Sequence, residues 1–190
     1  MTTASLRSWA VLPLLVLAVT LAGCSARTQV HSDLGIRGAP DWVNQGSQAL
    51  NDRKGRYIHG VGSAYMMSDA SLQSATADNR ARAEVARVLS SFMDVAIRDY
   101  SAQAGATGEE FSEQGVSRQV DNLTRVNMSG TRIIARWRDK RTGMLYSLAE
   151  LDMKAVKATV AATEQMNAGL REHIGGARGD NIFDAIVEGN

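Results

Sequence analysis

Residues 56–65 have the sequence RYIHGVGSAY, whose alternating side chains predict a β-strand. One face of this strand is formed mostly by small residues, namely Ile58, Gly60, Gly62 and Ala64. The other face carries Tyr57, His59, Val61 and Tyr65. Glycine weakens a strand unless another backbone approaches it closely. The sequence therefore predicts a closely packed neighbour on the glycine face.

The next segment predicts a long helix that supplies this neighbour. No glycine or proline occurs from Ser68 to Ala104, and Ser68 or Asp69 suits an N-cap. Small and apolar residues recur on one side at helical spacing: Ala70, Ala77, Ala81, Val85, Val88, Phe92 and Ala96. We expect the alanine-rich first half of this helix to lie against Gly60 and Gly62. On the opposite side, Asp94 and Arg98 predict a surface ion pair rather than a binding site.

The remaining chain predicts a second helix, a hairpin and a third helix. Gly105 ends the long helix, and a weaker helical pattern that Gly115 interrupts runs from Glu109 to about Asn127. Residues 131–138 and 144–151 predict the two strands of a hairpin, and residues 152–171 predict the last helix. This order predicts an α+β domain with a small, mainly antiparallel three-stranded sheet that long helices cover on one face.

The hairpin provides one candidate interaction surface and the first strand another. By the period of two, Ile133, Ala135 and Trp137 share one face, whereas Arg132, Arg136 and Arg138 share the other. This arginine row, followed by Lys140 and Arg141 in the turn, predicts a basic patch; the alternative is an ordinary solvated face. The rings of Tyr57, His59 and Tyr65 suit a protein interface, and the alternative is packing against the rest of the domain.

The N-terminus predicts a targeting segment. Arg7 precedes an apolar run at residues 9–20, which is too short for a transmembrane helix of about 20 residues and is typical of a signal peptide. Residues 21–24, LAGC, lead from small residues into the chain's single cysteine. This end resembles the lipobox of bacterial lipoproteins; the alternative is an incidental thiol after a plain signal peptide.

The lipobox resemblance implies cleavage before Cys24 and a lipid on its sulfur, which would anchor the protein in a membrane. In such lipoproteins an aspartate after the cysteine favours the inner membrane, so Ser25 implies the outer membrane. We expect the domain to face the periplasm, and the alternative is the cell surface. The expected organisation is a removed signal peptide at 1–23, a lipidated flexible tether at 24–39, the folded domain at 40–171, and a glycine-rich linker with a short apolar tail at 172–190.

Composition excludes several functional classes. The 190 residues include 21 Lys and Arg against 20 Asp and Glu, and removal of Arg7 with the signal peptide leaves the two signs equal. A nucleic-acid binder usually carries a basic excess, so we expect no nucleic-acid partner. His31, His59 and His173 lack metal-ligand spacing, and no G-x-S-x-G motif occurs. We therefore predict no metal, no cofactor and no enzymatic activity.

Five segments together resemble the LPP-twenty family of bacterial outer-membrane lipoproteins. They are residues 40–43, 57–64, 75–88, 130–137 and 145–149, and the likeness covers about residues 40–160. The family includes a flagellar lipoprotein and has no defining catalytic residues. The resemblance implies a structural or interaction module of the cell envelope, with itself or other envelope proteins as partners and a flagellar association. The alternative is a periplasmic binding or regulatory module that recognises peptidoglycan or another envelope component.

Overall fold

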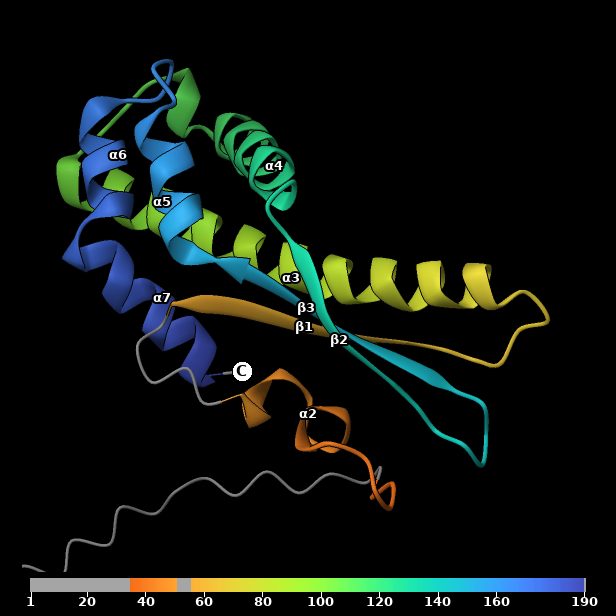
Figure 1. Ribbon diagram of the computed structural model, residues 1–190. Coiled ribbons are helices and arrows are strands. Elements are labelled where there is room, and N and C mark those ends of the chain that lie inside the picture. The colour runs from red at the N-terminus through yellow and green to blue at the C-terminus, as the bar shows by residue number, and fades with distance from the viewer. Residues whose placement is uncertain (1–34, 51–55, 190) are drawn as a thin grey trace, which may run out of the picture. The chain divides into compact units, whose positions relative to one another are not determined.

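The computed structural model describes residues 35–50 and 56–189. The elements are α2 (Asp41–Asn44), the 3-10 helix η1 (Gly46–Ala49), β1 (Tyr57–Ala64), α3 (Ala70–Ala104), the 3-10 helix η2 (Glu109–Phe111), α4 (Glu113–Met128), β2 (Arg132–Arg138), β3 (Leu145–Asp152), α5 (Met153–Ala161), α6 (Ala168–Gly175) and α7 (Ala177–Gly189) (Figure 1). The expected α+β class and order of elements are confirmed. The signal peptide, Cys24 and the first part of the tether lie outside the described residues.

The three strands form one antiparallel sheet in the order β1-β3-β2. The central strand β3 pairs with β1 in regular register, so that Gly60 lies opposite Ala149 and Gly62 opposite Ser147. A tight turn joins β2 and β3. Within this turn Asp139 accepts hydrogen bonds from the Arg141 amide and the Thr142 hydroxyl, at 2.8 and 2.7 Å.

Helix α3 packs directly on the glycine face of β1, as the sequence predicts (Figure 1). A Cβ atom added at Gly62 would lie 2.5 Å from the Ala77 carbonyl oxygen and would also collide with the Ala81 backbone. At Gly60 it would come within 2.8 Å of the Val85 amide nitrogen. The two glycines thus allow the helix backbone to approach the sheet more closely than any side chain would permit.

Helix α3 is 35 residues long and packs against two different parts of the fold. The Asp69 carboxylate caps its start by accepting from the Ser71 and Leu72 amides, and Gly105 ends it with a φ of 57°. Its first half lies on the sheet, whereas its second half contacts α4, α6 and α7. Phe92 and Ile97, both fully buried, belong to the same continuous core as Ile58 of β1.

Gly115 does not interrupt α4, which corrects the sequence-based expectation. Ser112 caps the helix and its hydroxyl oxygen accepts from the Gly115 amide at 3.1 Å. A Cβ atom at Gly115 would lie 2.6 Å from the Glu110 carbonyl oxygen. The glycine therefore permits η2 to fold back over the first turn of α4.

The C-terminal region also differs from the expectation. The helix predicted at 152–171 is divided into α5 and α6, and the predicted linker and tail at 172–190 form the end of α6 and all of α7 up to residue 189. Burial explains the difference, because Phe183 of α7 is 1% exposed and meets the Phe92 ring edge-on at 5.8 Å. The tail docks on the core.

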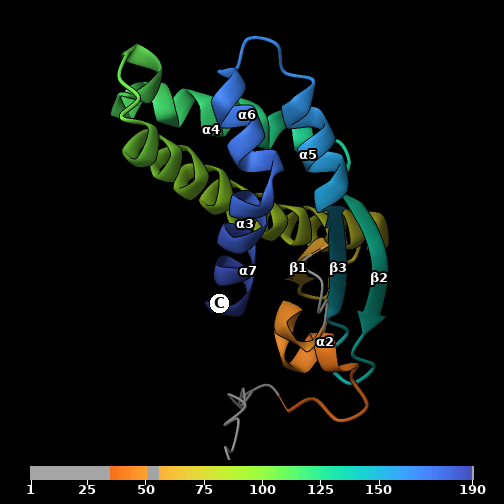
Figure 2. The ribbon, with the colours of Figure 1, turned by 90° about the vertical axis from the view of Figure 1, so that its left-hand side faces the viewer.

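The segment before β1 lies on the sheet face opposite α3 (Figures 1 and 2). Val43 of α2 is buried, and η1 contacts β1. Asn44 accepts from the Ile36 amide at 2.9 Å and donates to the Ile36 carbonyl at 3.2 Å. Ile36 is therefore fixed to the folded unit, so the folded part begins before the expected tether ends at residue 39.

Candidate functional site

A β-bulge divides the predicted arginine row. Arg132 pairs with Glu150 and Ile133 with Ala149, but Ala135 pairs with Leu148, so Ile134 is an extra residue in β2. After the bulge Arg136 lies opposite Ser147, on the α3 face of the sheet. Arg132 instead lies opposite Glu150, on the other face. The expectation that Arg132, Arg136 and Arg138 share one face is wrong for this reason.

Arg136 belongs to a polar contact between the sheet and α3. Its guanidinium donates to both carboxylate oxygens of Asp78, at 2.8 and 2.5 Å, and the Ser147 hydroxyl donates to the same carboxylate at 2.7 Å. Asp78 is 7% exposed. The Arg136 hydrogen bonds hold the pKa of the Asp78 carboxyl below its ordinary value. This arrangement joins α3, β2 and β3.

Arg138 takes part in a second polar contact at the end of the sheet. It donates to the Gln73 side-chain oxygen at 2.6 Å and to the Gly143 carbonyl at 3.1 Å. The Gln73 amide, which is 1% exposed, donates to the Tyr65 and Gly143 carbonyl oxygens at 2.9 Å each. These bonds hold the start of α3, the β1–α3 connection and the β2–β3 turn together.

Gln73 and Asp78 were missed by the sequence reasoning, although the sequence contained a signal for them. At helical spacing both fall on the same side of α3 as Ala77 and Ala81. A polar residue on a buried helix face needs a hydrogen-bonding partner. Here the arginines of β2 are those partners.

His59 and Arg132 meet at Glu150 on the sheet face opposite α3. The His59 Nε2 atom lies 3.3 Å from one Glu150 carboxylate oxygen, and Arg132 donates to the other at 3.1 Å. The His59 side chain is 10% exposed, and its ring centroid lies 6.1 Å from that of Tyr57. Tyr65 is separate from this group, because β1 ends at Ala64 and Tyr65 is 73% exposed. The predicted interaction surface of Tyr57, His59 and Tyr65 is therefore not continuous, because Tyr65 lies apart from the other two residues.

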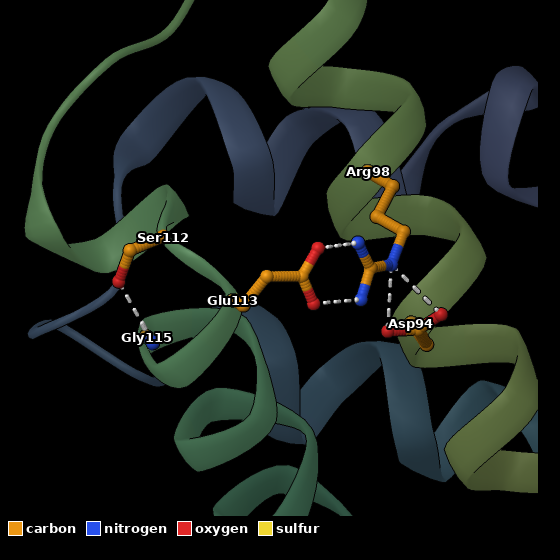
Figure 3. Close-up of polar contacts among 5 residues, drawn as sticks. All are labelled: Asp94, Arg98, Ser112, Glu113 and Gly115. Atoms are coloured by element: carbon orange, nitrogen blue, oxygen red, sulfur yellow. Dashed lines mark hydrogen bonds and ion pairs between the residues drawn. The ribbon is translucent and has the colours of Figure 1, made fainter.

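Two further charged clusters tie the helices to one another. Figure 3 shows Arg98 of α3 between Asp94 and Glu113, with the Arg98–Glu113 contacts at 2.7 and 3.0 Å. The Asp94–Arg98 pair is the one expected from the sequence, and Glu113 extends it to α4. All three side chains are largely exposed, so we interpret the cluster as a surface contact.

The second cluster centres on Asp99 of α3. Arg178 of α7 donates to it at 2.8 and 2.9 Å, and the His173 Nε2 atom of α6 lies 2.9 Å away. The Arg178 hydrogen bonds, with smaller contributions from Gln103 and His173, lower the pKa of the Asp99 carboxyl. This cluster fixes α6 and α7 to α3.

An open hollow of about 640 Å³ lies between the η2–α4 region and the segment after α5. Most of the residues around it are of polar or charged types, although apolar atoms make up most of its surface: Glu109, Glu110, Gly115, Arg118, Gln119, Asn122, Leu123, Thr163, Gln165 and Met166. Glu109 is already paired with Arg118 at 3.1 Å. No arrangement of a nucleophile with a base is formed by these side chains.

Within residues 35–50 and 56–189, no three side chains of the types His, Cys, Asp and Glu gather where they could hold a metal ion. In the same ranges no helix combines the length and apolar composition needed to cross a bilayer. Every buried side-chain nitrogen or oxygen of the described residues has a hydrogen-bonding partner. The buried polar side chains of these residues are thus engaged within the fold.

Comparison of the chain with protein-family models finds no match, and comparison with curated proteins finds no similar protein. The resemblance to the LPP-twenty family therefore stays a prediction, supported by the five quoted segments.

Proposed function

We propose that this protein is a lipid-anchored lipoprotein of the bacterial outer membrane that acts as a structural or interaction module of the cell envelope. The observation that carries the proposal is the sequence of residues 21–24, LAGC, directly after the apolar run at 9–20. The small residues and the single cysteine stand where a lipoprotein signal requires them. Two or three acyl chains on Cys24 would make the anchorage effectively permanent.

The arrangement of polar groups in the described residues supports an interaction module rather than a catalyst. The buried Asp78 is engaged by Arg136 and Ser147, and Asp99 by Arg178 and His173. A catalytic acid or base must instead reach a substrate atom. Exposed apolar side chains such as Tyr65 and Met66 suit contact with a partner.

Lipid labelling of Cys24 tests the proposal. Cells that express the full chain are grown with labelled palmitate, and the outer-membrane fraction is analysed for the protein. We expect Cys24→Ala to abolish the label and release the protein from that fraction, whereas the neighbouring Ser25→Ala keeps the label. Retention of Cys24→Ala in the outer membrane would overturn lipid anchorage as the cause of the location.

The family resemblance favours assembly of the protein with itself or with other envelope proteins, in the flagellum in particular. Peptidoglycan binding through the arginine row is the alternative, and the structure weakens its basis because Arg132, Arg136 and Arg138 are all bound to neighbouring side chains. Sedimentation of the fragment Ser25–Asn190 separates the two. Oligomers support assembly, whereas a monomer retained on purified peptidoglycan supports the alternative.

A deletion strain tests the flagellar association. We expect impaired swimming that the wild-type gene restores. Normal swimming of the deletion strain would remove the flagellar role and leave the general envelope role in place.

A further inference from the structure

One end of the sheet presents a pair of strongly exposed apolar side chains. This end, which we name the tip, comprises residues 65–72 between β1 and α3 and the β2–β3 turn at 139–144. Tyr65 and Met66 are each 73% exposed, the highest values among the large apolar side chains of the described residues. Leu72, in the first turn of α3, is 57% exposed. The tip therefore exposes three large apolar side chains.

The tip is a fixed part of the fold. The buried Gln73 amide binds the Tyr65 and Gly143 carbonyl oxygens at 2.9 Å each, which joins the two segments. The Met66 side chain lies directly on Gly143, where an added Cβ atom would be 2.8 Å from the Met66 sulfur. The Tyr65 carbonyl is thus fixed by a hydrogen bond, and the Met66 side chain lies against the turn. The exposure of Tyr65 and Met66 is a property of the folded state.

The β2–β3 turn exposes two cations, Lys140 and Arg141. The tip also has two carboxylates, of which Asp139 is buried and Asp69, before the first turn of α3, is exposed. Asp139 is 7% exposed and accepts from the Arg141 amide and the Thr142 hydroxyl, and Asp69 accepts from the first amides of α3. A surface that exposes two cations next to an exposed tyrosine and methionine is suited to an anionic phospholipid interface.

The described chain begins at Gly35, ahead of α2. In both ribbon views the described chain begins on the side of the β2–β3 turn and then enters α2 (Figures 1 and 2). Eleven residue steps separate Cys24 from Gly35, the first described residue. Even when fully extended they span at most about 40 Å. A lipid on Cys24 would therefore hold Gly35, where the described chain begins, within about 40 Å of the membrane surface.

We propose that the tip lies on the anionic phospholipid surface of the membrane that holds the Cys24 lipid. This inference rests on the proposed lipid anchorage. Lys140 and Arg141 would approach phosphate groups, while Tyr65, Met66 and Leu72 would enter the interfacial layer. The contact need not be strong in free solution, because the tether confines the domain near the membrane and makes the contact intramolecular.

A spin label at the tip tests this proposal in the lipidated full-length mature protein. The chain has a single cysteine, and its sulfur is occupied when lipidated, so Met66→Cys provides one labelling site. The protein is reconstituted into vesicles of phosphatidylethanolamine and phosphatidylglycerol, and the accessibility of the label to oxygen and to a water-soluble nickel chelate is measured. Val126→Cys is the matched control, because Val126 is 58% exposed on α4, outside the tip.

We expect the ratio of oxygen to nickel accessibility at position 66 to exceed that at position 126 at least threefold. In the double variant Lys140→Glu and Arg141→Glu, or in vesicles of phosphatidylcholine alone, the ratio at position 66 should fall toward the control value. Equal ratios at positions 66 and 126 in the anionic vesicles would overturn the proposal and leave a protein partner as the occupant of the tip.

The two proposals fail in distinguishable ways. The mass of the purified protein and its flotation with vesicles report the lipid on Cys24 without reference to the tip. A chain that lacks the lipid and does not float contradicts the anchorage. A lipidated chain that floats while the label at position 66 remains in water contradicts only the tip proposal.

Discussion

Asp78 connects three elements through one carboxylate, and its ionisation contributes to stability. Arg136 and Ser147 donate to it, and the Arg136 hydrogen bonds lower its pKa from the ordinary value of 3.8. A group whose pKa is lower in the folded than in the unfolded chain stabilises the fold above the unfolded pKa. That contribution is lost as the pH falls through the folded pKa. The folded state should therefore weaken in acid below about pH 4.

We expect Asp78→Asn to lower the free energy of unfolding at pH 7 by about 1–3 kcal/mol, because the charged hydrogen bonds to Arg136 are lost. At pH 2.5 the difference from the wild type should be smaller, since the wild-type carboxyl is then closer to its own protonation. Urea unfolding of the fragment Ser25–Asn190 at both pH values measures this.

Asp121→Asn is the control for this experiment, because Asp121 is exposed on α4. It should change the free energy of unfolding by less than about 0.5 kcal/mol. An equal loss from Asp78→Asn at pH 7 and pH 2.5 would show that the charge of Asp78 contributes nothing.

At the level of single residues, the small face of β1 was predictable and the pairing of the arginines was not. Gly60 and Gly62 alternate within an otherwise β-favouring segment, and the alanines of α3 match them. The partners of Arg136 and Arg138 lie 58 and 65 residues away on α3. No local pattern in β2 specifies them, because they depend on which face the strand presents to the helix.

The bulge in β2 decides that face. Ile134 is 45% exposed and has no pairing partner in the register with β3. Side chains alternate along a strand, so one extra residue shifts the alternation. All residues on one side of the bulge then lie on the face opposite to the one that regular alternation predicts. The sequence of residues 131–138 gives no sign of the bulge. A prediction that assumed regular alternation therefore placed the three arginines on one face, which is wrong.

We expect deletion of Ile134 to lower the free energy of unfolding by less than about 1 kcal/mol. In the shortened strand Ile133 would stay opposite Ala149 and Ala135 opposite Leu148, so every side chain of β2 would keep its face. The variant Ile134→Ala is the matched control, because it keeps the residue count and should cost under about 1 kcal/mol. Thermal unfolding compares them, and a loss of more than about 2 kcal/mol from the deletion alone would show that the bulged geometry itself stabilises the sheet.

The C-terminal helices show why tertiary burial is hard to predict from a short segment. Glycines at 175, 176 and 179 are typical of a linker, and the apolar segment after them is brief. In the structure Ile182 and Phe183 are buried in the core that includes α3, which stabilises α7 as a helix. The apolar residues of α7 are visible in the sequence, but the core surface on which they pack is formed only by the tertiary fold.

Across the folded unit, α3 belongs to both the sheet end and the helical end of the core. Its first half packs on β1 and β3, and its second half on α4, α6 and α7. The larger cluster of buried apolar residues includes both Ile58 and Phe183, whereas Ala64, Ala77 and Leu145 form a smaller one. A helix shared in this way should make the two ends unfold together.

Phe183→Ala tests this coupling in the fragment Ser25–Asn190. Removal of the buried ring should lower the free energy of unfolding by about 3–5 kcal/mol. The fragment contains two tryptophans, Trp42 and Trp137, and both belong to the sheet end. We expect the urea midpoints from tryptophan fluorescence and from far-ultraviolet circular dichroism to shift equally.

The control Val187→Ala, at a 40% exposed position of α7, should shift both midpoints only slightly. If Phe183→Ala moved the circular-dichroism midpoint and left the fluorescence midpoint unchanged, the helical end would be an independent folding unit.

The length of α3 also sets the distance between the tip and the helical end of the molecule. At about 1.5 Å per residue, its 35 residues extend about 52 Å from the tip to the last turn beside Gly105. With the tip on the bilayer as proposed, a helix standing upright would carry α4, α6 and their neighbours some 50 Å into the aqueous compartment. A protein embedded in the membrane would then contact the tip, and a protein beyond the headgroups would contact the opposite end of the molecule. The length of α3 would set the distance between these two partners.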